Sequence, residues 1–156
     1  MSDNLKTPGE LKSALKRGER LMGVDLGSKT IGLALSDLSL TVATPLETIR
    51  RVKFTADANR MLELIAQHGV GGLVVGLPLN MDGSEGPSAQ SARAFVRNFE
   101  KLSPLPLAFW DERLSTAAVT RTLLEADTSR ARRAEVVDKM AAAYILQGAL
   151  ERMRSL

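Results

Sequence analysis

The sequence contains no cysteine, which excludes disulfide bridges, thiolate zinc sites and a thiol nucleophile. Its single histidine, His68, closes a helical segment, so we expect it at the surface. Aromatic residues make up 4% of the chain, too few for the base-stacking platforms of single-strand binders. No stretch reaches the roughly 18 apolar residues that span a bilayer, and the first twenty residues lack a signal-peptide core. These absences predict a soluble, cytoplasmic protein that makes no use of a membrane.

Several familiar motifs are also missing. No Gly-Lys dipeptide occurs, so there is no P-loop, and no Gly-x-Ser-x-Gly elbow holds a serine nucleophile. The glycines at Gly23 and Gly27 do not complete a dinucleotide fingerprint, because the segment that follows has the pattern of a strand. The polar loop from Asn80 to Ser84 lacks the ligand series of a calcium loop.

The 156 residues, 44% of them hydrophobic, are typical of one domain with its own core. We therefore expect a single domain over 1–156, in which 1–19 form an N-terminal extension with a short helix. The net charge of +3 and the pI of about 9.5 suit a polyanionic partner such as nucleic acid.

The pattern along the chain predicts an α/β fold in which a mixed sheet carries helices on its faces. Thr7 and Glu10 form a capping box that starts the first helix, and Gly18 ends it. Pro45 places its strand at a sheet edge or bends it. The segment from Thr128 to Arg133 is expected to connect the last two helices. Predicted helices cover 7–17, 54–68, 88–102, 115–126 and 134–153, and predicted strands cover 21–26, 31–36, 41–49, 72–77 and 105–110.

Three acidic residues lie on otherwise apolar elements. Asp25 shares a strand face with Leu21 and Gly23, and a buried carboxylate there needs a hydrogen bond, an ion pair or a metal. Glu112 follows a strand, where catalytic groups of α/β sheets recur. Asp138 belongs to a helix stripe that should face the core. For each acid a structural role remains open: a turn hydrogen bond, a loop ion pair, or attraction to the helix dipole. Convergent carboxylates are what Mg²⁺ or Mn²⁺ requires to cleave a phosphodiester.

At this point the chain resembles the YqgF/RuvX family, whose members are described as Holliday-junction resolvases and as pre-16S ribosomal RNA nucleases. The matching segments extend in order from residue 21 to about 150. They are Gly23-Val24-Asp25-Leu26-Gly27 with Thr30-Ile31-Gly32, Val74-Val75-Gly76-Leu77-Pro78-Leu79-Asn80-Met81-Asp82-Gly83, Asp111-Glu112-Arg113-Leu114-Ser115-Thr116, and Val137-Asp138-Lys139 with Ala141-Ala142 and Ile145-Leu146.

The resemblance implies a ribonuclease H-like sheet of five strands in the order 3-2-1-4-5, with strand 2 antiparallel to the rest. It implies a nuclease that is a monomer or homodimer, with Asp25, Glu112 and Asp138 as catalytic metal ligands. Better-characterised resolvases place an acid at the end of the fourth strand, where this chain has Leu77-Pro78-Leu79-Asn80, so Glu112 is the expected substitute, with Asp82 a further candidate. Expected phosphate contacts are Lys29, Thr30, Asn80, Arg113, Ser115 and Thr116, and Arg130, Arg132 and Arg133 extend the basic surface or form a solvated loop.

Two other classes of function stay open. Asp-x-Gly after a first strand also opens the ATP-dependent enzymes of the actin and sugar-kinase type, but these need two such domains. A non-catalytic RNA-binding assembly factor of the same fold is the second alternative. The sequence does not choose between structured RNA and DNA junctions as the nuclease substrate.

Overall fold

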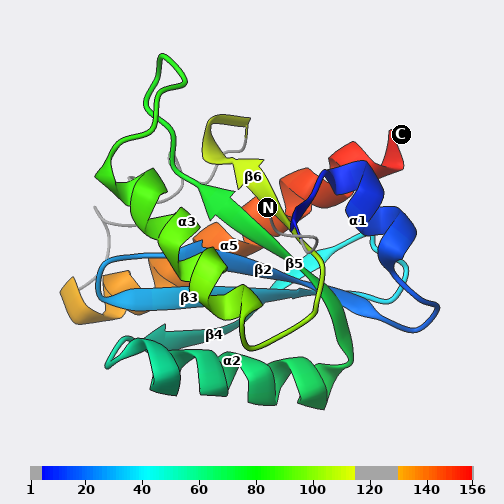
Figure 1. The fold of residues 1–156 in the computed structure, drawn as a ribbon, viewed down its shortest axis with the longest axis horizontal. Coiled ribbons are helices and arrows are strands. Elements are labelled where there is room, and N and C mark those ends of the chain that lie inside the picture. Colours follow the sequence, from blue (N-terminus) through cyan, green and yellow to red (C-terminus); the bar gives the residue numbers. More distant parts are fainter. Residues whose placement is uncertain (1–4, 115–129, 156) are drawn as a thin grey trace.

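A computed structural model describes residues 5–114 and 130–155, with the backbone alone for 130–138. Six strands, four α-helices and one 3-10 turn follow one another in this part of the chain (Figure 1). In chain order they are β1 (Leu5–Lys6), α1 (Pro8–Ala14), β2 (Arg20–Leu26), β3 (Thr30–Ser36), β4 (Ala43–Arg50), α2 (Phe54–His68), β5 (Val70–Leu77), α3 (Pro87–Glu100), β6 (Leu107–Asp111), η1 (Glu112–Leu114) and α5 (Arg130–Arg154).

The strands form one sheet in the order β1-β6-β5-β2-β3-β4. β3 is antiparallel to both of its neighbours, whereas β2, β5 and β6 are parallel. This confirms the predicted order and the one reversed strand. Pro45 lies in edge strand β4, opposite Ala34 at a register shift, so the strand is both at an edge and irregular.

The structure adds a sixth strand that the sequence pattern did not predict. β1 has two residues and pairs Leu5 with Leu107 at the free edge of β6. α1 then begins at Pro8 with the predicted capping box, in which Glu10 N donates to Thr7 Oγ1 at 3.2 Å. The helix ends at Ala14 rather than near Gly18, because residues 15–18 turn the chain back into β2.

Helices cover both faces of the sheet (Figure 1). α2 and α3 lie on one face, where they enclose a hydrocarbon core that includes Val24, Val75 and Phe95. α5 lies on the other face together with α1, over a second core that includes Leu11, Val74 and Ile145. Because side chains alternate along a strand, each buried strand contributes to both cores.

α5 approaches the sheet very closely. A Cβ on Gly23 would lie 2.7 Å from the carbonyl oxygen of Ala142 and 2.8 Å from Leu146 Cβ. On the neighbouring strand β3, the residues facing α5 are the small Gly32, Ala34 and Ser36. The helix therefore rests on backbone and small side chains, which sets its distance from the sheet.

α5 is longer than the predicted last helix. It begins at Arg130, so Arg130, Arg132 and Arg133 belong to its first turns and not to a connecting loop. The helix predicted near 115–126 lies outside the described residues. Within the described part of the chain, no helix has the length and hydropathy to cross a membrane.

We predict that Gly23→Ala destabilises the fold by about 2 kcal/mol or more, because the added methyl group would meet the backbone of α5, which has no room to retreat. The midpoint of urea denaturation measures the loss. Gly86→Ala is the matched control, since a Cβ there would come no closer than 3.5 Å to its nearest neighbour, the Asn80 side chain, and its φ of −92° suits alanine. Equal losses of stability in the two variants would contradict the close packing of α5 on Gly23.

Candidate active site

Asp25 is buried at the carboxyl end of β2, with 4% of its surface exposed. It pairs across the sheet with Gly32 of β3, and it lies on the same strand face as Leu21 and Gly23, which both contact the α5 layer. The opposite face of β2 carries Met22 and Val24 in the α2/α3 core. The alternation of the strand therefore places this one acid under α5.

Glu112 brings a second carboxylate to the same face. Its Oε2 atom lies 3.2 Å from the position that a Cβ on Gly76 would occupy, and Ile145 of α5 contacts the same position. Gly76 follows Val75, the register partner of Val24, so Asp25 and Gly76 are at the same level on adjacent strands. Neighbouring strands are about 4.8 Å apart, so the two acids belong to one small region.

Asp138 is the third predicted ligand, and its side chain lies outside the described residues. Its backbone is one turn before Ala142 in α5, which runs opposite to β2 (Figure 1). Ala142, Ile145 and Ala149 of the predicted stripe are buried as expected. Among the side chains that the structure describes, no three acidic or histidine side chains gather as a metal site.

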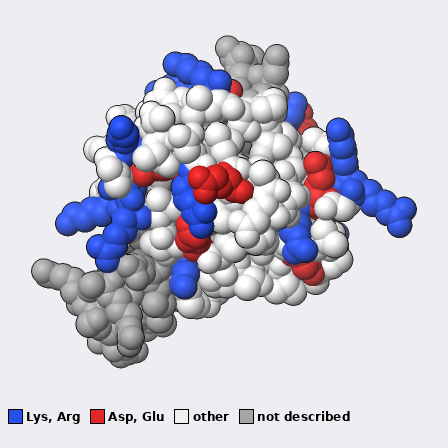
Figure 2. All heavy atoms as spheres, turned by 90° about the horizontal axis from the view of Figure 1, so that it is seen from below, with Lys and Arg blue, Asp and Glu red and all other residues white. Residues whose placement is uncertain are grey.

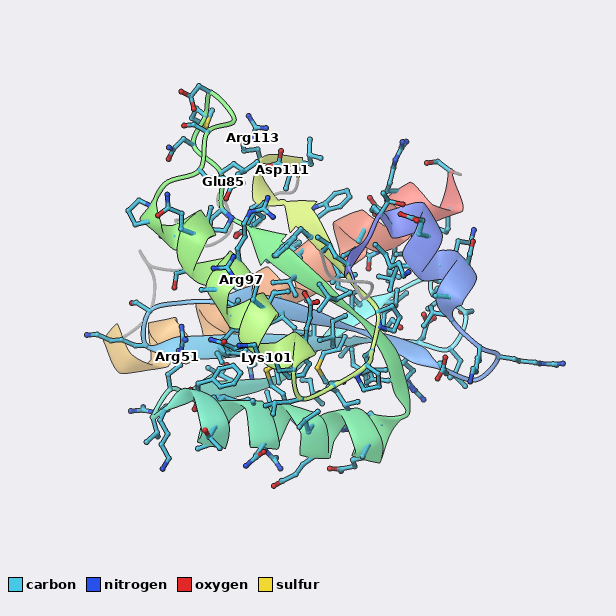
Figure 3. All side chains as sticks on the ribbon, in the orientation of Figure 1. Arg51, Glu85, Arg97, Lys101, Asp111 and Arg113 are labelled. Carbon is cyan, nitrogen blue, oxygen red and sulfur yellow. The ribbon has the colours of Figure 1, made fainter. Side chains whose placement is uncertain are left out.

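Asp111 and Arg113 flank Glu112 and bind each other. The Arg113 backbone N donates to Asp111 Oδ1 at 3.0 Å and caps η1, while the guanidinium Nη2 donates to Oδ2 at 2.7 Å. Nη1 donates to the carbonyl of Met81 at 3.1 Å, which ties the loop after β5 to η1. The two labelled side chains lie together beside that protruding loop (Figure 3). This pair fixes the turn that carries Glu112.

Arg113 was predicted to contact phosphate, and in this structure its guanidinium binds Asp111 and the carbonyl of Met81. Asp111 was not singled out by the sequence. An Asp two residues before the bonded N–H is the signature of an Asx turn, which was the available signal. The hydrogen bonds from Arg113 hold the pKa of Asp111 below its usual range.

The loop from Pro78 to Gly86 is organised by its own side chains. Asn80 Nδ2 donates to Ser84 Oγ at 3.0 Å, and Ser84 Oγ donates to Asp82 Oδ1 at 2.6 Å. These bonds from Ser84 lower the pKa of the exposed Asp82 carboxyl. Asn80 and Asp82, both candidates from the sequence, thus shape the loop in this structure.

On the β3–β4 side of the site, Arg51 connects the turn after β2 to α2 and α3. Its Nη1 donates to the carbonyl of Gly27 at 2.7 Å, its guanidinium lies 5.7 Å from the ring centre of Phe95, and its Nε is 4.0 Å from the buried Asp57. The turn that follows Asp25 is therefore pinned to α2 and α3. Sequence reasoning did not find Arg51, because its partners are remote along the chain.

Of the remaining predicted phosphate contacts, two are described by the structure and two are not. Lys29 is exposed and Thr30 half-buried in the β2–β3 turn, four and five residues after Asp25. Ser115 and Thr116 lie outside the described residues. His68 closes α2 in its last turn, half-buried and far along the chain from the acids.

Comparison with known proteins identifies the family of this chain. The family model described as "RuvX: Holliday junction resolvase" matches residues 19–152. The chain belongs to the RuvX family. It is 67% identical over 144 residues to a protein of Paramagnetospirillum magneticum named "Putative pre-16S rRNA nuclease", covering 92% of this chain and 93% of that one. A protein of Methylocella silvestris with the same name is 56% identical over 156 residues, covering 100% and 97%.

Solved structures support the fold of this RuvX family member. RuvC of T. thermophilus in complex with a Holliday junction substrate aligns with a TM-score of 0.55 at 15% identity, covering 88% of this chain and 97% of that one. T. thermophilus RuvC alone aligns with a TM-score of 0.53 at 14% identity, covering 87% and 97%. Together with the strand order, the likeness establishes the ribonuclease H-like fold.

We predict that Asp111→Asn lowers stability by about 1 kcal/mol at pH 7, because one ion pair and a charge-assisted cap of η1 are lost. The folded pKa of Asp111 is lowered, so its stabilisation is present above the unfolded pKa of about 3.9. It disappears as the pH falls through the folded pKa. Urea midpoints of parent and variant should converge in acid, and a constant difference from pH 7 to pH 2 would contradict this account.

Proposed function

We propose that this protein is a metal-dependent nuclease that hydrolyses phosphodiester bonds of structured nucleic acid, and that it processes the 5′ end of pre-16S rRNA in the cytoplasm. The observation that carries the proposal is the pair of carboxylates, Asp25 and Glu112, on one sheet face at Gly76. Family membership and the names of the curated relatives support the same activity.

The donor set fits a hard divalent cation. Carboxylate oxygens are the ligands that Mg²⁺ and Mn²⁺ prefer, and two like charges in a buried region favour a cation between them. Asp25, Glu112 and Asp138 would hold it. When bound, such an ion supplies Lewis-acid activation of water and neutralises charge on the scissile phosphate.

The chain's own residues keep this region in place. Gly76 leaves room for the Glu112 carboxylate, since a Cβ would lie within 3.2 Å of it. The Asp111–Arg113 pair orients the turn, and Arg51 holds the backbone that follows Asp25. Lys29 and Thr30 remain our proposed phosphate contacts within the described residues, with Ser115 and Thr116 proposed beyond them. Asn80 and Arg113 also stay proposed phosphate contacts, and in this structure their side chains shape the adjoining loop.

A Holliday-junction resolvase is the second candidate, because the matching family model bears that description. A resolvase that cuts a junction symmetrically needs a dimer, whereas trimming one RNA end does not. A non-catalytic RNA-binding factor is the third candidate and predicts binding without turnover. All three make different predictions for one experiment.

That experiment compares a precursor-rRNA fragment with a four-way DNA junction in the presence of Mg²⁺ or Mn²⁺. We expect cleavage of the RNA fragment at a defined 5′ site and loss of all cleavage with EDTA, because without a cation the carboxylates repel the phosphodiester and nothing stabilises the developing charge. Symmetric nicks in the junction alone would favour the resolvase. Binding of either substrate without any product would establish a non-catalytic factor.

We predict that Asp25→Asn abolishes cleavage, by about 10³-fold or more, while the metal-free protein keeps or gains stability because one of two like charges is gone. Mg²⁺ should raise the melting temperature of the parent far more than that of the variant.

Asp57→Asn is the matched control at the other buried aspartate. Asp57 is 3% exposed and accepts a hydrogen bond from the Val52 backbone N at 3.2 Å, so its role is structural. Its replacement should cost about 1–3 kcal/mol and, because Asp57 acts on the site only through Arg51, lower activity per folded molecule far less than Asp25→Asn does. If Asp25→Asn unfolds the protein yet keeps specific activity, Asp25 is no metal ligand.

A further inference from the structure

The β2–β3 turn and the β4–α2 connection lie side by side at the carboxyl end of β2. Thr30 pairs with Arg50 in the sheet, and the Arg51 backbone N donates to the carbonyl of Lys29 at 2.8 Å. These contacts bring together three exposed cations from two segments, which we call the basic edge: Lys29, Arg50 and Lys53.

Arg51 lies beneath the basic edge and anchors it. Its bond to the carbonyl of Gly27 and its approach to Asp57 and Phe95 hold both segments against α2 and α3. The cations therefore project from backbone that is fixed in place. A rigid display of charge loses less conformational freedom when it binds a partner.

Three acidic side chains that the structure describes near the basic edge bind arginines outside it. Glu47 and Glu63 both bind Arg60, at 2.7 and 2.9 Å, and Asp57 is buried against Arg51. Seen from the α2 side, lysine and arginine side chains project from both ends of the molecule, several of them at the left end, the end of the β2–β3 turn in Figure 1, and acidic ones lie mainly in the middle and on the right (Figure 2). Among the side chains that the structure describes there, the exposed charges of the edge are therefore mainly positive.

On the β5–β6 side of Asp25 and Glu112, the described cations are paired with acids. The loop after β5 and the turn after β6 carry acids whose neighbouring cations are engaged: Arg113 binds Asp111, and Arg93 binds Glu85 at 2.7 Å. Arg51 and Arg113 lie well apart in Figure 3, so the two sides are distinct surfaces. From the described side chains alone, we expect a polyanion to meet more attraction on the β3–β4 side than on the β5–β6 side.

Aromatic rings take no part in this surface. None of the large hydrophobic side chains exposed in the described part of the chain is aromatic. Unpaired bases are held largely by stacking on such rings, whereas a duplex is held through its phosphates. The chemistry of the edge therefore fits the backbone of a double-stranded stem.

We propose that Lys29, Arg50 and Lys53 form a phosphate-binding surface that holds a double-stranded flank of the nucleic acid on the β3–β4 side of Asp25. This inference rests on the proposed nuclease function. It adds a direction to it, because the double-stranded flank of the substrate lies on the β3–β4 side of the acids. The loop from Pro78 to Gly86 then lies beside the other flank and contributes less to its binding.

The test measures binding and cleavage separately. The edge variant is Lys29→Gln/Arg50→Gln/Lys53→Gln. The matched control is Lys16→Gln/Arg17→Gln/Arg152→Gln, which removes the same charge from exposed residues, two of them before the amino end of β2. Fluorescence anisotropy gives the Kd of an RNA hairpin and of its unpaired strand at 50, 100 and 200 mM KCl, with Ca²⁺ in place of Mg²⁺.

We expect the edge variant to bind the hairpin about 10- to 100-fold more weakly at 100 mM KCl, and its salt slope to fall by about two. The control should stay within about threefold of the parent. Hairpin binding by the edge variant at parental strength and slope would overturn the proposal. An equal loss for hairpin and unpaired strand would overturn its assignment to a duplex.

Failure of this proposal is distinguishable from failure of the nuclease function. A parent that cuts, with an edge variant that binds normally, rejects the edge alone. A parent that never cuts, with an edge variant that loses hairpin binding, rejects the nuclease and keeps the edge. If the triple variant does not fold, Lys29→Gln/Lys53→Gln against Lys16→Gln/Arg17→Gln repeats the comparison, with a salt slope that falls by about one to two.

Discussion

The structure depends on how closely α5 approaches the sheet at Gly23. A single methyl group at this position would meet the carbonyl of Ala142 at 2.7 Å. Gly76 meets Ile145 from the same helix, and Gly148 of α5 lies against the ring of Trp110. Three strands and one helix are thereby brought to a fixed separation. Any group that α5 presents to the strand ends inherits this distance, including the backbone of Asp138.

The two faces of the sheet have separate tasks because side chains alternate. Met22 and Val24 point into the α2/α3 core, which stabilises the fold by apolar burial. Asp25 points to the α5 face, where it is paired across the sheet with Gly32 and where Gly76 on the next strand adjoins the Glu112 carboxylate. A shift of one residue in β2 would exchange the faces, burying the acid in hydrocarbon. The hydrophobic pattern that specifies the fold therefore also specifies where the acid lies.

Elements with strong local patterns were predictable. α2 has its predicted bounds, and Pro45 predicted that β4 lies at an edge or is bent, both of which the structure shows. β1 was not predictable, because two residues carry no period and their pairing with Leu107 is remote. Asp25 and Glu112 could be selected as acids on apolar elements. The partners of Arg51 and Arg113 could not, because a guanidinium on a loop reads as a free cation until folding brings its acceptors near.

The proposed carboxylate site would repel the backbone of a nucleic acid, and this conflict gives a reason for the arrangement of the described charges around it. Cations placed between the acids would pair with them and occupy the reaction centre. In this chain Arg113 is held aside by Asp111, and Arg51 is drawn inward by Gly27 and Asp57. The described cations that are exposed near Asp25 are those of the basic edge, in the β2–β3 turn and at or just after the end of β4. Attraction there can offset the repulsion at the acids without neutralising them, and it also selects one direction for the backbone.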